Sequence, residues 1–213
     1  VLGRLLLQMV QLSLSQAVLS GLSFKRFSMA TVISGDTGVS QCQPGSVTPD
    51  ALAQRLTLET AKTASGTSIS FAGIPAWAKR ITVMFDGVGT NGAGVICVRV
   101  GAGALALTGY KFSVLQIVNT GASAGTISSN GANLPLWYTA WHPSYDLMGH
   151  LVLTKISGNT WVCSAMCGAT QTGQATHMTG SITLASDLAL LSVTTVNGTD
   201  TFDAGSVNIL YEG

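Results

Sequence analysis

The sequence predicts an all-β protein, an antiparallel β-sandwich of jelly-roll-like topology preceded by a short helical neck. The first observation is the alternation of side chains in segments such as ITVMFD at 81–86, which indicates a half-buried strand. The second is the punctuation of such segments by Thr, Ser, Asn and 25 glycines without collagen's three-residue period. The third is a charged fraction of only 9%, against about 25% in ordinary globular proteins.

The charge balance also bounds the function. Ten Lys and Arg residues against nine Asp and Glu residues give a formal net charge of +1. A net charge this close to zero favours self-association, so we expect an oligomer. The chain has no basic stripe and no interleaving of Arg with aromatic residues, so a nucleic-acid partner is not expected.

Residues 1–28 differ from the rest, and we expect an N-terminal extension or an amphipathic helix that packs on a partner. Gln and Ser residues interrupt the apolar run, so no membrane span is expected. Two other interpretations stay open. Arg4 could open a secretory signal, or Met29 could be the natural start of the protein, ahead of the neck and the β domain.

Residues 29–66 are predicted to form a neck or linker that contains a short helix. Thr48 is suited to cap a helix and Pro49 to occupy its first position. Leu52 and Leu56 follow at helical spacing, which predicts a helix near 50–61. A helix this short is marginal alone and must pack on another element.

Residues 67–213 are predicted to form the β-sandwich domain. Two of the strands should form a hairpin around SGN at 157–159, a favourable turn sequence. The strand count is sufficient for two sheets packed face to face. Strands are expected near 67–72, 81–86, 95–100, 110–118, 134–141, 149–156, 160–166, 177–184, 188–196 and 206–211.

The four cysteines are Cys42, Cys97, Cys163 and Cys167. The last two form a C-x3-C pair without the second pair or the histidines of a zinc signature, so no metal site is expected. In a strand they share one face with Trp161, which predicts buried free thiols.

The best candidate for ligand binding is the aromatic segment WYTAWHPSYD at 137–146. Trp and Tyr combine apolar faces with polar tips, which suits sugar stacking or protein contact. The alternative is a loop that folds its rings back onto the sandwich. Weaker candidates are loops at 86–94 and 119–133, and the predicted ligand-binding residues are Trp137, Tyr138, Trp141, His142 and Tyr145.

No catalytic constellation or cofactor motif is recognised, so we expect a chain that is not an enzyme. His142, Ser144 and Asp146 could be combined into a Ser-His-Asp triad, but adjacent loop positions do not set a base beside a nucleophile. Asp200 and Asp203 lack the spacing of a calcium loop and should bond to the local backbone instead.

Three segments carry a resemblance to a known family: SISFAGIPAWAKRITVMFDGV at 68–88, LTKISGNTWVCSA at 153–165 and TTVNGTDTFDAGSVNILYE at 194–212. They resemble a β-rich module at the C-terminal ends of tail-fibre-like, receptor-binding proteins of tailed bacteriophages and prophages. Residues 35–57 look like the neck before such a module, so the resemblance covers most of the chain.

The resemblance implies location in the virion, homotrimeric assembly and other virion proteins as partners. We therefore expect a non-enzymatic tail-fibre or receptor-binding module that attaches to a bacterial surface glycan or protein. One alternative is a capsid decoration or head-fibre protein. Another is a secreted β-sandwich carbohydrate-binding module, which would need residues 1–28 to be a signal.

Overall fold

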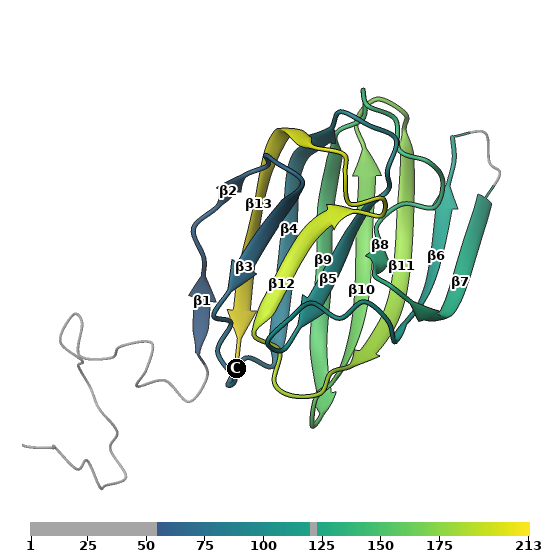
Figure 1. Ribbon diagram of the computed structural model, residues 1–213. Helices are drawn as coiled ribbons and strands as arrows, with labels where there is room; N and C mark the ends of the chain where they lie inside the picture. The colour runs from purple at the N-terminus through teal and green to yellow at the C-terminus, as the bar shows by residue number, and fades with distance from the viewer. Residues whose placement is uncertain (1–54, 120–122) are drawn as a thin grey trace, which may run out of the picture. The chain divides into compact units, whose positions relative to one another are not determined.

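The computed structural model describes residues 55–119 and 123–213. The predicted extension at 1–28, most of the predicted neck and Cys42 lie outside these residues. The described residues form strands and no helix, which confirms the all-β prediction (Figure 1). The strands are β1 (Leu56–Leu58), β2 (Lys62–Thr63), β3 (Ser68–Ala72), β4 (Arg80–Thr90), β5 (Ile96–Gly101), β6 (Tyr110–Ile117), β7 (Ser123–Gly131), β8 (Leu134–Pro135), β9 (Leu147–Ser157), β10 (Thr160–Ala169), β11 (Gln174–Thr183), β12 (Leu190–Thr195) and β13 (Phe202–Glu212).

The strands form two antiparallel sheets. The nine-stranded sheet has the order β1-β13-β4-β9-β10-β11-β6-β7, with β2 also paired to β13, and the four-stranded sheet has the order β3-β12-β5-β8. The antiparallel pairs β4–β13, β5–β12, β6–β11 and β9–β10 are nested in sequence, as in a jelly roll. The β9–β10 hairpin, however, lies within the large sheet between β4 and β11.

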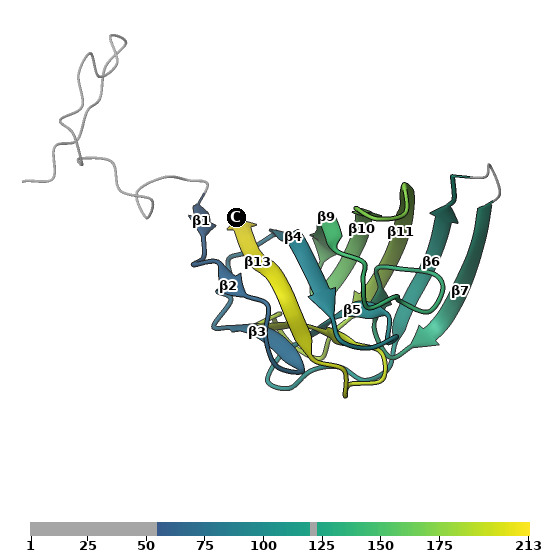
Figure 2. The same cartoon turned by 90° about the horizontal axis from the view of Figure 1, so that it is seen from above.

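The small sheet lies against one face of the large sheet, and the core fills the space between them (Figures 1 and 2). Alternation along each strand sends apolar side chains inward, such as Ile81, Val83 and Phe85 of β4 and Val98 and Val100 of β5. Each fully buried side chain of this kind contributes about 1.5–3 kcal/mol.

The predicted hairpin around 157–159 is confirmed, because β9 and β10 pair from Ser157 with Thr160 onward, with one register shift between Thr160 and Trp161. Gly158 occupies the turn with φ 50, in the left-handed region that favours glycine. The neighbouring pairs of β10 with β11 and of β11 with β6 complete the centre of the large sheet.

The predicted helix near 50–61 is wrong in its described part. Leu56–Leu58 form β1, which pairs with Leu210–Glu212 of β13. The backbone groups of Arg55 and Gly213 also exchange hydrogen bonds of 3.0 and 2.9 Å. Pairing with an available strand satisfies these backbone groups, and this tertiary contact overrides a weak local preference for helix.

Two other predictions need correction. The strand expected at 134–141 shrinks to β8, because the chain beyond Pro135 leaves the ladder and packs between the sheets. The expected loops at 86–94 and 119–133 contain strand: β4 extends to Thr90, and most of the second loop is β7. β7 has the sequence SAGTISSNG, whose composition does not indicate a strand. It is a strand because it pairs with β6.

Candidate functional site

Hydrogen bonds to both sheets fix the chain at Leu136, immediately before the aromatic segment. On the small sheet, β8 pairs with β5, and the Leu136 N–H donates to the Ile96 carbonyl at 3.0 Å. On the large sheet, the Thr176 hydroxyl donates to the Leu136 carbonyl at 2.7 Å. The segment therefore lies between the two layers and closes one side of the core.

The structure separates the five predicted ligand-binding residues into two groups. Trp137 and Trp141 are 1% and 2% exposed, and their rings pack edge to face with centroids 5.3 Å apart. Both rings belong to the core, as the alternative interpretation expected. Tyr138 and Tyr145 are half-buried and His142 is exposed, so for these three residues ligand binding stays a prediction.

Next to this segment, β7 and β8 border a cavity of about 310 Å³, which we call the β7–β8 groove. Its lining comes from β6, β7, the β8 segment and the ends of two small-sheet strands. No lining side chain is charged. The lining residues are Val95, Phe112, Thr126, Gly131, Ala132, Asn133, Pro135, Trp137, Tyr138 and Val196.

Asn133 is the unusual residue of the β7–β8 groove. It is only 7% exposed, yet its side-chain amide hydrogen-bonds to no other residue in the described part of the chain. The fully buried side-chain polar atoms that lack a partner in the described part of the chain are Arg99 Nε, Trp141 Nε1 and Trp161 Nε1, so the Asn133 amide nitrogen and oxygen each keep some accessible surface at the groove. The amide therefore has both donor and acceptor capacity to offer to a molecule in the groove.

Of the residues that line the groove, only Trp137 and Tyr138 were predicted from the sequence as ligand-binding residues. Asn133, Thr126 and Phe112 come from separate segments, and Thr126 lies in a stretch expected to be a loop. A side-chain amide that lines a groove without a protein partner has no signature in sequence. Only the pairing of β6 with β7 brings these residues beside the aromatic segment.

The His142 and Ser144 side chains do lie together, with 2.7 Å between Ser144 Oγ and His142 Nδ1. The Ser144 backbone N–H also points to this nitrogen, at 3.2 Å, which is the geometry of a local turn. Asp146 instead accepts a hydrogen bond from Gln171 at 2.8 Å. Since no described carboxylate orients His142, the geometry does not form a Ser-His-Asp triad.

The Asp200 carboxylate accepts a hydrogen bond from the Gly94 N–H at 2.6 Å, so it bonds to the backbone of a distant loop and not, as was predicted, to the local backbone. The described residues contain no group of three or more His, Cys, Asp or Glu side chains suited to hold a metal ion. Cys97, Cys163 and Cys167 are buried free thiols, as predicted. Burial raises the pKa of each thiol to about 12.

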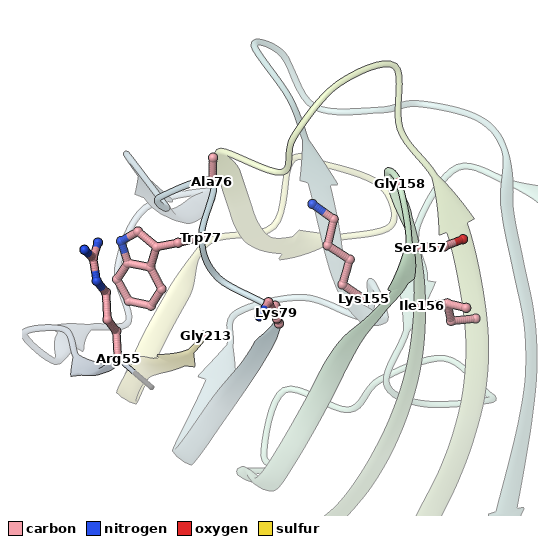
Figure 3. Close-up of a pocket in the computed structure, with 9 residues that line it drawn as sticks. All are labelled: Arg55, Ala76, Trp77, Lys79, Lys155, Ile156, Ser157, Gly158 and Gly213. Carbon is pink, nitrogen blue, oxygen red and sulfur yellow. The ribbon is translucent and has the colours of Figure 1, made fainter. Parts of the chain in front are cut away.

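A second cavity, of about 400 Å³, has the opposite character (Figure 3). Arg55, Lys79 and Lys155 line it together with Trp77 and the turn at 156–158. The Arg55 guanidinium lies 5.4 Å from the centre of the Trp77 ring. The Lys155 ammonium pairs with Asp187 at 2.9 Å, so part of the positive charge is already compensated.

Comparison with known protein families, with curated proteins and with solved structures gives no match. Within residues 55–119 and 123–213, no helix has the length and apolar character needed to cross a membrane.

Proposed function

We propose that this chain is a non-enzymatic bacteriophage virion protein, a tail-fibre or receptor-binding module that assembles as a homotrimer and attaches to a bacterial surface. The resemblance of three segments to tail-fibre-like proteins supports the virion assignment. The observation that carries the assembly is the part of the outer face of the large sheet that lies across β6, β9, β10 and β11, which is exposed and has no Lys, Arg, Asp or Glu at the positions named below.

Strand register defines this face. Met84, His150, Met166, His177 and Leu115 are consecutive partners across β4, β9, β10, β11 and β6. Their sequence neighbours point inward and are mostly buried, so this row faces outward. Leu115 and Met166 are among the exposed large hydrophobic residues.

The two rows of outward residues on either side of the Met166 row are uncharged as well on β6, β9, β10 and β11. No residue in these positions is acidic, Lys or Arg. We call the set the outer patch: Ser113, Leu115, Ile117, Met148, His150, Val152, Ser164, Met166, Gly168, Ala175, His177 and Thr179.

The size of the outer patch matters for this proposal. Four strands with three outward residues each cover roughly 400 Å² at ordinary strand spacing. Exposed apolar patches of this size on soluble proteins commonly mark interaction sites. A second copy of the chain is a suitable partner, since flat uncharged faces pack without leaving ions desolvated.

A matched pair of variants tests the assembly. Met166→Glu places a charge in the centre of the outer patch, at a position 62% exposed in the single chain. Leu107→Glu makes the same change at a position 61% exposed in the β5–β6 connection. Analytical ultracentrifugation should show a trimer for the wild type and Leu107→Glu, and smaller species for Met166→Glu. A monomeric wild type would refute the assembly.

Location and attachment need a separate measurement. Antibody labelling of purified phage particles, viewed by electron microscopy, should place the protein at the tail, and labelled protein should adhere to host cells. Labelling on the capsid would favour the head-fibre alternative. Absence from particles would refute the virion assignment altogether.

A further inference from the structure

We propose that the β7–β8 groove binds a neutral saccharide unit and that the Asn133 amide is its polar anchor. This inference specifies the ligand of the attachment function proposed above, and it rests on that function for the biological source of the sugar.

The Asn133 amide is unpaired among the described residues and lines the groove. Asn133 is more than nine-tenths buried, lines the groove and has no hydrogen-bond partner among the described residues. A side-chain amide presents one acceptor oxygen and two donor hydrogens. Two neighbouring hydroxyls of a sugar ring supply one donor and one acceptor. Together they form a pair of hydrogen bonds with the amide oxygen and the amide nitrogen.

Aromatic rings line part of the groove. Phe112 and Tyr138 are half-buried and line the groove, so part of each ring stays accessible. The C–H face of a sugar packs against such a ring, while its hydroxyls need partners at the edge. The Tyr138 hydroxyl and the Thr126 hydroxyl have no partner among the described side chains, and both are available for this purpose.

The side chains that line the groove carry no charge. The groove has no ionisable Lys, Arg, Asp or Glu in its lining, whereas Arg55, Lys79 and Lys155 line the second cavity. A carboxylate or phosphate in the groove would lose its hydration without gaining a cation, which is costly. The groove therefore favours a neutral sugar over an acidic one.

Size and access agree with a small ligand. The volume of about 310 Å³ lies at the lower end of ordinary small-molecule sites. β6 and β7 extend past the small sheet, so the inner face of β7 stays uncovered (Figures 1 and 2). Thr126 lies on that face opposite the buried Val114, yet it is exposed. A ring at the end of a larger glycan could enter from this side.

The test uses the full chain and four neutral probes, the methyl glycosides of glucose, galactose, mannose and N-acetylglucosamine, with glucuronate as a charged counterpart. Saturation-transfer NMR should detect at least one neutral glycoside, and Asn133→Ala should weaken its binding about tenfold or more. Because the amide has no partner in the described protein, Asn133→Ala should leave the thermal unfolding midpoint unchanged. This separates a ligand-binding residue from a structural one.

Two further variants locate the site. Val196→Trp places a large ring at the groove from a half-exposed position and should abolish binding. Tyr138→Ala should weaken binding, whereas Tyr145→Ala, at a half-buried tyrosine of the same segment outside the groove, should not.

The outcomes are distinct. The inference is overturned if none of the four glycosides binds, if glucuronate binds the groove equally well, or if Asn133→Ala and Val196→Trp leave binding intact. If no sugar binds but the protein still forms trimers and adheres to host cells, only this inference fails. If a glycoside binds the groove but the protein is absent from particles, the proposed virion function is refuted and sugar binding in the groove is confirmed.

Discussion

At the scale of single residues, one tyrosine connects the two sheets. The Tyr110 hydroxyl, from β6, accepts a hydrogen bond from the Val100 N–H at 2.8 Å and donates to the Val100 carbonyl at 3.0 Å. β8 is too short to pair with this part of β5, so the side chain substitutes for a missing strand. Burial raises the pKa of Tyr110 to about 12, which keeps the hydroxyl protonated in neutral solution.

Tyr110→Phe should therefore destabilise the protein by about 1–3 kcal/mol, because it leaves the Val100 N–H buried and unpaired. The Val100 carbonyl still accepts a hydrogen bond from the Ala106 N–H in this variant. The destabilisation therefore comes mainly from the Val100 N–H, which loses its partner. Urea unfolding measures the difference. Tyr145→Phe is the control, since no described residue bonds to its hydroxyl, and equal effects of both variants would contradict the argument.

The buried thiols give a prediction about alkaline pH. Their pKa of about 12 in the folded state lies above the ordinary 9.0. The folded protein thus retains protons that the unfolded chain releases, and stability falls as the pH rises from about 9 towards 12. Thermal unfolding should show this decline. A variant with Ala at Cys97, Cys163 and Cys167 should show a smaller one, and an equal decline would show that the thiols do not contribute.

At the scale of elements, the β9–β10 hairpin forms the centre of the large sheet, and Gly149 is its critical position. Gly149 has φ +129, and a Cβ added there would lie 2.2 Å from the backbone carbonyl oxygen of Met166. This residue pairs with Phe85 immediately before the irregularity in the β4–β9 ladder. A side chain here would disturb two ladders at once.

Gly149→Ala should cost at least about 2 kcal/mol, because the backbone conformation and the close contact both oppose a Cβ. Gly103→Ala is the matched control, with nothing within 4 Å of the added atom. Chemical denaturation of both variants tests the difference. Similar stability of the two proteins would mean that β9 adjusts its path.

At the scale of the whole molecule, stability depends on burial and backbone pairing and very little on charge. The two ion pairs within the described residues, Arg80–Glu212 and Lys155–Asp187, both include a side chain that is largely accessible to water. Exposed pairs of this kind contribute about 0–1 kcal/mol. The apolar layer between the sheets and the antiparallel ladders therefore carry the fold.

The thermal unfolding midpoint should accordingly change little, by less than about 3 °C, between low salt and about 0.5 M sodium chloride. Differential scanning calorimetry at neutral pH measures it, and a midpoint that fell steeply with added salt would show that ion pairs contribute more than their exposure suggests. The oligomer should likewise resist salt, because the outer patch contains no ion pair to screen.

Several parts of the fold were predictable from the sequence for a clear physical reason. Alternation located β4 and the β9–β10 hairpin, since one buried and one exposed face impose a period of two. The stripe of Trp161, Cys163 and Cys167 predicted the buried thiols in the same way. These features depend on neighbours within a few residues along the chain.

Other parts could not be read from local pattern. Leu56 follows Leu52 at helical spacing, but Leu56–Leu58 pairs with β13, which lies more than 140 residues away in sequence. The composition of β7 indicates a loop, and its pairing with β6 makes it a strand. The aromatic segment was predicted as a contact region, and packing buries Trp137 and Trp141 in the core while Trp137 and Tyr138 line the groove.

By itself, the sequence determined an all-β domain with a low-charge surface, because side-chain period and composition are local properties. Only the tertiary structure decided which face of which strand stays uncovered. The outer patch exists because neighbouring strands of the large sheet align their outward residues in register. The Asn133 amide lines the groove without a partner among the described residues because segments distant in sequence meet there, and no single stretch of the chain encodes that contact.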